Sequence, residues 1–236
     1  GQKGEGMTET EQTMTWLTML FEPEDVFEVR VKEQDDRGAV QTWYNMRQKG
    51  QFFAEVAAPI HVTNHRHVWV GVAPRTEPGN TIAKLIRVLW VDLNATITDI
   101  SQVHKLLETP AVPKPTMIVN SGNGFHLYWK LTEPIDADVA RKWTKGIHAE
   151  FPTDATHDPT RIMRVPGTLN VKDPENPKPC FIEEYHPERV YPPNAFPQAH
   201  VNLVQHITRT SRRLITPADR QLFISNWLDG QKHTMA

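Results

Sequence analysis

The sequence predicts a mixed α+β fold, because strand patterns and helix patterns alternate along the chain without a regular order. Alternating apolar residues at 26–31 and 40–44, separated by a turn at 35–38, predict a hairpin. The apolar run 86–93 predicts a buried strand. Of the 236 residues, 39% are hydrophobic and 23% charged, a composition typical of globular proteins.

The other elements follow from periodicity and from the turn residues between them. Helices are predicted at 10–21, where Met14, Leu17 and Leu20 share a face, at 100–107, with Asp99 or Ser101 as N-cap, at 136–151, and at 216–228 behind Thr216. Further strands are predicted at 67–72, 116–119, 125–129, 161–165 and 180–182. Residues 1–9 are expected to be a disordered tail or cloning remnant, 10–195 the core, and 196–236 a helical extension leading to a further region of a longer protein.

Composition also excludes several classes of protein. The single cysteine, Cys180, excludes an internal disulfide and favours a reducing, cytoplasmic location. No apolar run reaches the roughly 20 residues that cross a bilayer, so no membrane partner is expected. The net charge is −2, so any contact with nucleic acid must come from local basic patches.

The first chemical motif is Asp92-Leu93-Asn94, at the end of the buried strand. Residues two apart on a strand point to the same face, so this strand end presents one carboxylate and one carboxamide together. An Asp-x-Asp in such a place can hold two magnesium ions for phosphoryl transfer. Here the second acid is replaced by an amide, so the motif also indicates a weakened site.

Two further motifs follow along the chain. Ser-Gly-Asn-Gly-Phe-His at 121–126 predicts a tight turn whose backbone N–H groups and serine hydroxyl can cradle phosphate; alone, it is equally typical of an ordinary hairpin. Asp158 is followed by Arg161 and Arg164 and by a Pro-Gly turn, and arginine forks suit phosphates. Alone, this run would indicate a salt-bridged loop.

Together, the three motifs resemble the archaeo-eukaryotic primase superfamily, in particular the primase-polymerases of phages, plasmids and CRISPR-associated proteins. The resemblance rests on Asp92-x-Asn94, on Ser-Gly-Asn-Gly-Phe-His-Leu-Tyr-Trp at 121–129, and on Arg-Val-Pro-Gly-Thr-Leu-Asn-Val-Lys at 164–172. It spans roughly residues 15 to 190. It implies an N-terminal αβ lobe and a lobe built like an RNA-recognition module, with the active site in the cleft between them.

The resemblance also implies roles for individual residues and partners. Asp92, Asn94 and Asp158 would be the catalytic residues and would hold two Mg²⁺ or Mn²⁺ ions. The residues that would bind the incoming nucleotide are Ser121, Gly122, Asn123, Gly124, His126, Arg161, Arg164, Asn170, Lys172, Arg75 and Tyr128. The implied activity is DNA synthesis from (d)NTPs on a single-stranded DNA template, by primer extension and by de novo initiation, with a helicase region in the longer protein.

Asn94 is the departure from the family pattern. An amide oxygen ligates a hard cation but lacks the full charge of a carboxylate, so loss of rate by orders of magnitude is expected. Three explanations remain open: an engineered Asp→Asn change, a natural variant with weak or manganese-dependent activity, and a naturally inert binder.

Other functions remain as alternatives. The main one is a non-catalytic module that binds nucleic acid or nucleotides with a primase-like fold; a cyclase-like palm domain is more distant. His61, His65 and His67 suggest a rolling-circle nickase or, with Cys180, a zinc site, although their spacing fits neither. Trp43 or Tyr44 would stack on bases, and the basic run at 209–213 would contact template phosphates or be solvated.

Overall fold

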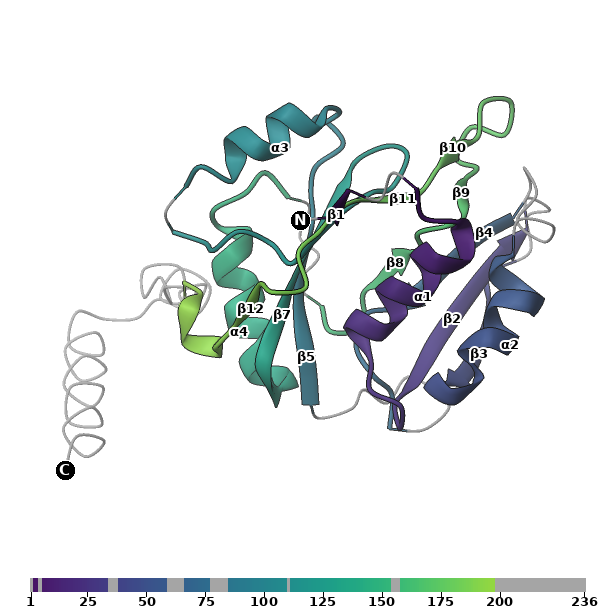
Figure 1. Cartoon of the computed structure of the whole chain (residues 1–236), viewed down its shortest axis with the longest axis horizontal. Coiled ribbons are helices and arrows are strands. Elements are labelled where there is room, and N and C mark those ends of the chain that lie inside the picture. Colours follow the sequence, from purple (N-terminus) through teal and green to yellow (C-terminus); the bar gives the residue numbers. More distant parts are fainter. Residues whose placement is uncertain are drawn as a thin grey trace, which may run out of the picture. The chain divides into compact units, whose positions relative to one another are not determined.

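The computed structural model confirms the mixed α+β fold and divides its strands between two main antiparallel sheets (Figure 1). The structure describes residues 2–3, 6–33, 38–58, 66–76, 85–109, 111–153 and 158–197. The predicted helix at 216–228, residues 35–37 of the predicted turn, His61, His65 and the basic run at 209–213 lie outside them. None of the helices in these ranges is both long enough and apolar enough to cross a membrane.

The central sheet has the strand order β1-β11-β6-β7-β12, and β5 pairs with the other edge of β7. Its strands are β1 (Gln2–Lys3), β5 (Leu85–Asp92), β6 (Met117–Asn120), β7 (Phe125–Asp136), β11 (Phe181–Tyr185) and β12 (Val190–Tyr191). All neighbours are antiparallel except β12, which runs parallel to β7. Because β1 pairs with β11, Gln2 and Lys3 belong to the sheet rather than to a disordered tail.

The N-terminal sheet has the order β3-β2-β4-β8. Its strands are β2 (Val26–Glu33), β3 (Val40–Asn45), β4 (Arg66–Gly71) and β8 (Ile162–Arg164). The short strands β9 (Leu169–Asn170) and β10 (Lys178–Pro179) form a separate hairpin. The last strand of the N-terminal sheet therefore comes from the second half of the chain, so the two expected lobes are not consecutive in sequence.

Helix α1 (Glu9–Leu20) lies between the two sheets (Figure 1). It begins at Thr8, whose hydroxyl accepts from the Glu11 N–H while the Glu11 carboxylate accepts from the Thr8 N–H. On one side the buried Trp16 meets the edge of Tyr128 in β7. On the other, the Thr13 hydroxyl donates to Pro166 O, close to β8. A single hydrophobic core thus joins both sheets through this helix.

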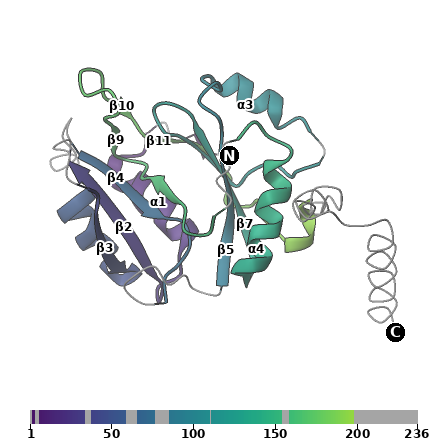
Figure 2. The same ribbon diagram turned by 180° about the vertical axis from the view of Figure 1, so that it is seen from behind.

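The other helices cover outer surfaces. Helix α4 (Ala137–His148) packs on β5 and β7 (Figure 2). Phe151, which follows α4, stacks on Trp129 of β7. Helix α3 (Ile100–Leu106) is capped by Asp99, as predicted. The helical segment after β3 was not predicted; it comprises a 3₁₀ turn (Met46–Gln48), α2 (Lys49–Phe52) and a π turn (Phe53–Ala57).

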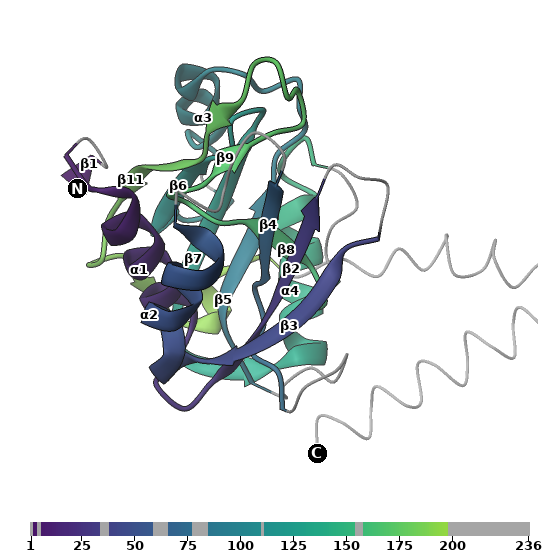
Figure 3. The ribbon, with the colours of Figure 1, turned by 90° about the vertical axis from the view of Figure 1, so that its right-hand side faces the viewer.

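The two faces of the N-terminal sheet differ in character. Phe27 of β2 contacts Phe21, which follows α1, as well as Tyr44 of β3 and Phe52 of α2. Both helices therefore lie on the Phe27 side (Figure 3). Since side chains alternate along a strand, Glu28 and its neighbours in register point to the opposite side.

Residues 191–197, which carry three prolines, are part of the folded unit. Pro193–Ala195 forms a 3₁₀ turn, and the buried Phe196 meets the rings of Trp129 and Tyr191 edge-on. Phe196 thus packs against the central sheet together with Tyr191.

Candidate active site

Asp92 and His126 lie opposite each other at one end of the central sheet. Asp92 ends β5, His126 is the second residue of β7, and the two are direct partners in the antiparallel register. The apolar residues before Asp92 are buried, so the carboxylate is placed at the strand end, where its side chain is 25% exposed. Its Oδ1 lies 3.7 Å from His126 Nε2.

Arg161 reaches this carboxylate from the N-terminal sheet. The backbone N–H of Arg161 donates to Asp158 O, and the Thr160 N–H donates to Asp158 Oδ1, so a tight turn precedes β8. From this turn Arg161 Nη2 donates to Asp92 Oδ2. The structure therefore brings Asp92, His126 and Arg161 together, with the exposed Asp158 three residues before Arg161 in the same turn.

Burial sets the protonation state of the two rings beside Asp92. It lowers the pKa of His126, and the nearby Asp92 carboxylate opposes this shift only in part, so the imidazole is neutral at pH 7. Burial also raises the pKa of Tyr128 well above its usual value. The Tyr128 hydroxyl, 3.4 Å from His126 Nδ1, thus stays protonated and can hold the histidine ring in place.

The predicted turn between β6 and β7 forms, but several of its donors are used internally. The Ser121 hydroxyl donates to Gly124 O, and the Gly122 N–H donates to Asn120 Oδ1. Gly122 has a φ of +87°, which glycine adopts without strain. The serine hydroxyl and one of the N–H groups expected to cradle phosphate therefore stabilise the turn itself.

The β9–β10 hairpin braces this turn from outside. The buried Asn170 donates from Nδ2 to Ser121 O over 2.7 Å, and its Oδ1 accepts from the Lys172 N–H. A Cβ on Gly122 would lie 2.9 Å from Asn170 Cβ. Lys178 Nζ donates to Asn123 Oδ1 at 3.1 Å, which places this exposed lysine beside the turn.

Replacing Asn170 with alanine is expected to lower the free energy of unfolding by about 1–3 kcal/mol. The change leaves the buried Ser121 carbonyl without its donor. Chemical denaturation measures the effect, and Asn176→Ala in the exposed part of the hairpin is the matched control. Equal stability of the two variants would show that Asn170 does not brace the turn.

Four residues predicted to touch the nucleotide have other partners in the structure. The wholly buried Tyr128 packs against Trp16, and Asn170 holds the Ser121 turn. The side chain of Arg75 is fully buried against the Glu28 carboxylate. Arg164 is buried too: its Nη1 donates to Leu169 O and its Nη2 lies 3.2 Å from His67 Nδ1. These four side chains support the fold around the site, and their contact with a nucleotide stays a prediction.

Asn94 lies beyond the end of β5, so it does not form the predicted strand-end pair with Asp92. The strand ends at Asp92, and Asn94 Oδ1 accepts from the Thr96 N–H over 3.0 Å. The Ile97 N–H donates to Asn94 O, so Asn94 starts a turn of the kind that Asn and Asp favour. An Asp at this position would keep the same acceptor and gain a charged second oxygen.

The donor atoms present suit a hard divalent cation. Asp92, Asn94 and Asp158 offer oxygen ligands only, and Mg²⁺ needs few carboxylates when phosphates and water complete its shell. Within the ranges that the structure describes, no three His, Cys, Asp or Glu side chains cluster closely enough to hold a metal without such added ligands. In the structure described here, the Arg161 guanidinium is the cation paired with the Asp92 carboxylate.

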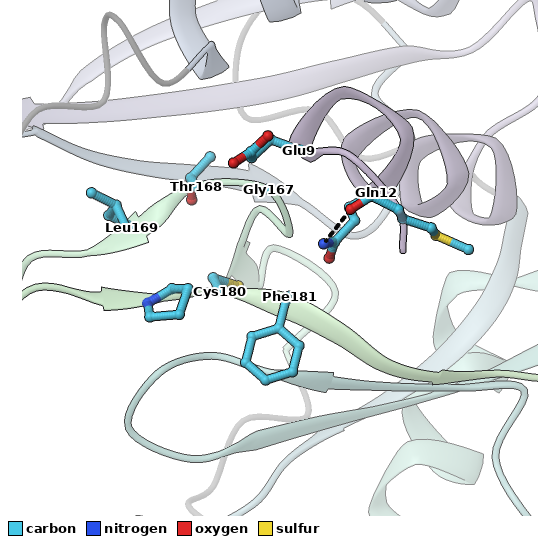
Figure 4. A pocket seen from close by; sticks show the side chains of 9 residues that line it. Glu9, Gln12, Gly167, Thr168, Leu169, Cys180 and Phe181 are labelled. Carbon is cyan, nitrogen blue, oxygen red and sulfur yellow. Dashed lines mark hydrogen bonds between the residues drawn. The ribbon is translucent and has the colours of Figure 1, made fainter. Parts of the chain in front are cut away.

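The histidine and cysteine alternatives lose their support. His67 stacks on Trp69 and faces Arg164, and burial raises the pKa of Cys180 to about 12, so the thiol stays protonated. A separate pocket of about 200 Å³ lies between α1 and the β9–β10 hairpin (Figure 4). It is lined by residues such as Glu9, Gln12 and Phe181, none of which belongs to the Asp92 site. Its volume is below that of typical ligand sites.

Several solved structures share the fold of this chain. The primase-polymerase domain of cyanophage S-2L superposes with a TM-score of 0.59 at 17% identity, covering 78% of this chain and 93% of that one. Primase RepB′ superposes with a TM-score of 0.56 at 12% identity, and the match covers 94% of this chain and 69% of that one. The catalytic domain of RepB′ in complex with initiator DNA superposes with a TM-score of 0.54 at 13% identity, and the match covers 86% of this chain and 99% of that one.

The chain therefore has the fold of the archaeo-eukaryotic primases. No protein-family model matches the sequence, and neither does any curated protein. At these identities the likeness defines the fold alone, so the chemistry must be argued from the residues around Asp92.

Proposed function

We propose that this chain is a DNA primase-polymerase that transfers nucleotides from (d)NTPs to a 3′-hydroxyl on a single-stranded DNA template. The observation that carries the proposal is the meeting of Asp92, His126 and Arg161 where the two sheets approach each other. A carboxylate, a neutral imidazole donor and a guanidinium at one point form a suitable site for a metal-bound triphosphate. The primase fold supports this assignment.

Each residue has a distinct task in the proposed reaction. Asp92 and Asp158 would hold the metal ions, with Asn94 as a neutral third ligand. His126 Nε2 would donate to a phosphate oxygen, and Arg161, whose side chain is 33% exposed, would turn from Asp92 towards the charge on the phosphates. When bound, the two cations would supply the charge that favours the attacking hydroxyl and the leaving pyrophosphate.

Lysines of the β9–β10 hairpin and the loop between its strands would extend the phosphate site. Lys172 and Lys178 are both exposed, and Lys178 is tied to Asn123 at the tip of the turn. Lys178 was not among the predicted site residues, because its position depends on the pairing of β10 with β9. The Lys178 ammonium beside the turn would partly replace the donors that the turn uses internally.

Replacing His126 with alanine is expected to weaken (d)NTP binding about 10- to 100-fold, the range for loss of a hydrogen bond to a charged group. Calorimetric titration of dATP in the presence of Mn²⁺ measures the affinity. The control is His104→Ala, since His104 lies on α3, is paired with Glu184 and is largely exposed. Unchanged affinity in the His126 variant would remove the histidine from the nucleotide site.

A non-catalytic nucleotide-binding module is the second candidate. Asn94 favours it, because its carboxamide serves a local turn and brings no charge to the metal ligands. The two candidates agree on binding and differ only in turnover.

A further inference from the structure

Strand register places a basic and aromatic surface on the side of the N-terminal sheet that faces away from α1 and α2. We call it the Trp69 face, because Trp69 is its central side chain. Its members on β2, β3, β4 and β8 are Glu28, Arg30, Lys32, Gln41, Trp43, His67, Trp69, Ile162 and Arg164. The site proposed above uses none of them.

Two rings on this face form a parallel pair. His67 and Trp69 are two residues apart on β4; their ring centroids lie 5.0 Å apart and their planes differ by 4°. Arg164 contacts both rings. Its guanidinium carbon lies 5.2 Å from the Trp69 ring centre, and its Nη2 lies 3.2 Å from His67 Nδ1. Both rings remain partly exposed. They are therefore held in place yet accessible.

Cations on β2 lie directly across from these rings. Arg30 is the register partner of Trp69, and Lys32 is the partner of His67. The Arg30 side chain is 28% exposed, and Lys32 is exposed. Side chains opposite each other in an antiparallel pair have Cβ atoms about 5 Å apart, so each ring has a positive charge beside it.

The net charge of the Trp69 face is positive. Its one carboxylate, Glu28, is wholly buried and is already paired with Arg30 and with Arg75. The Arg75 guanidinium lies over Gly71, which has no side chain there. Burial and the neighbouring cations Arg164 and Lys32 lower the pKa of His67, so its ring is neutral. Charge alone would suit any polyanion, but the ring pair selects one that carries planar groups.

We propose that the Trp69 face binds single-stranded DNA, with bases stacked on the Trp69–His67 pair and phosphates against Arg30 and Lys32. The inference rests on the proposed function, since it assigns the template strand to a surface distinct from the nucleotide site. Binding by stacking tolerates any base sequence.

The test measures binding of a fluorescent oligothymidylate and of an abasic oligomer of equal length by anisotropy. Trp69→Leu keeps apolar bulk and removes the stacking ring, so it is expected to weaken oligothymidylate binding about tenfold or more and to leave abasic binding unchanged. Lys32→Gln, an exposed position, is expected to weaken both and to reduce the slope of log affinity against log salt by about one. Tyr44→Phe on the opposite face is the control and should change neither.

Two results would overturn the inference. If Trp69→Leu weakens both oligomers equally, bases do not stack on Trp69; if Trp69→Leu and Lys32→Gln both bind normally, the strand lies elsewhere. Circular dichroism checks the fold, and if Trp69→Leu does not fold, Lys32→Gln decides whether the strand lies on this face.

Synthesis assays separate this inference from the proposed function. If DNA synthesis requires Asp92 but binding of single-stranded DNA is unchanged in Trp69→Leu and Lys32→Gln, the Trp69 face is rejected as the DNA site and the polymerase assignment stands. Strand binding that requires Trp69, without synthesis by this chain or by Asn94→Asp, would keep the Trp69 face and reject the polymerase.

Discussion

Replacing Asp92 with asparagine is expected to reduce nucleotidyl transfer by about 10²–10³-fold or more, measured in the Asn94→Asp background. The change removes the charge that would hold the cations and leaves the shape of the strand end intact. Loss of one well-placed electrostatic partner in an active site has an effect of this size. Gel-based primer extension with Mn²⁺ measures the rate.

The matched control for this prediction is Asp138→Asn, an exposed carboxylate in the first turn of α4. Its rate should equal that of the parent. Binding of single-stranded DNA should survive in the Asp92→Asn variant, because Asp92 is not on the Trp69 face. Full activity of Asp92→Asn would mean that Asp92 is not a metal ligand.

Replacing Gly167 with alanine is expected to lower the free energy of unfolding by about 3 kcal/mol or more. Gly167 has a φ of +92°, and an added Cβ would lie 2.3 Å from Glu9 O and 2.7 Å from Thr13 Oγ1. Neither the strain at positive φ nor the clash with the α1 backbone can be relieved without moving the helix. Urea denaturation followed by circular dichroism measures the loss.

Gly50→Ala is the matched control for Gly167→Ala. Gly50 lies within α2, and an added Cβ there would meet nothing within 4 Å. The helical position should gain up to about 1 kcal/mol, because alanine is the better helix former. Similar stability of the two variants would show that the close approach of α1 to Gly167 is not rigid. The glycine in the Arg-x-Pro-Gly-Thr run therefore has a structural reason of its own.

The sequence predicted the elements whose signal is local. The capped helix α3, the strand β5 that ends at Asp92, and the Ser121 turn appear where periodicity and turn residues indicated. Strand β7 extends seven residues further than predicted and includes Pro134. The proline has no N–H to donate, and it is tolerated because the pairing with β5 is interrupted between Ile86 and Val88.

Contacts between distant segments were beyond sequence reasoning. Arg75 resembled a phosphate ligand because it follows a strand, but its partner Glu28 lies 47 residues earlier in the chain. Arg164 lies beside Arg161 in the same basic run; the alternation of β8 turns Arg164 towards Trp69, whereas Arg161 precedes the strand and reaches Asp92. Only the register of β4 with β8 separates their roles.

The most direct test of the polymerase assignment compares this chain with its Asn94→Asp version in primer extension and de novo dinucleotide synthesis, with Mg²⁺ and with Mn²⁺. Because Asp can keep the turn that Asn94 forms with Thr96, the fold should not change. We expect Asn94→Asp to make product about 10²-fold faster than the unchanged chain. If neither makes product although both bind dATP and single-stranded DNA, the polymerase assignment is contradicted and the chain is a binding module.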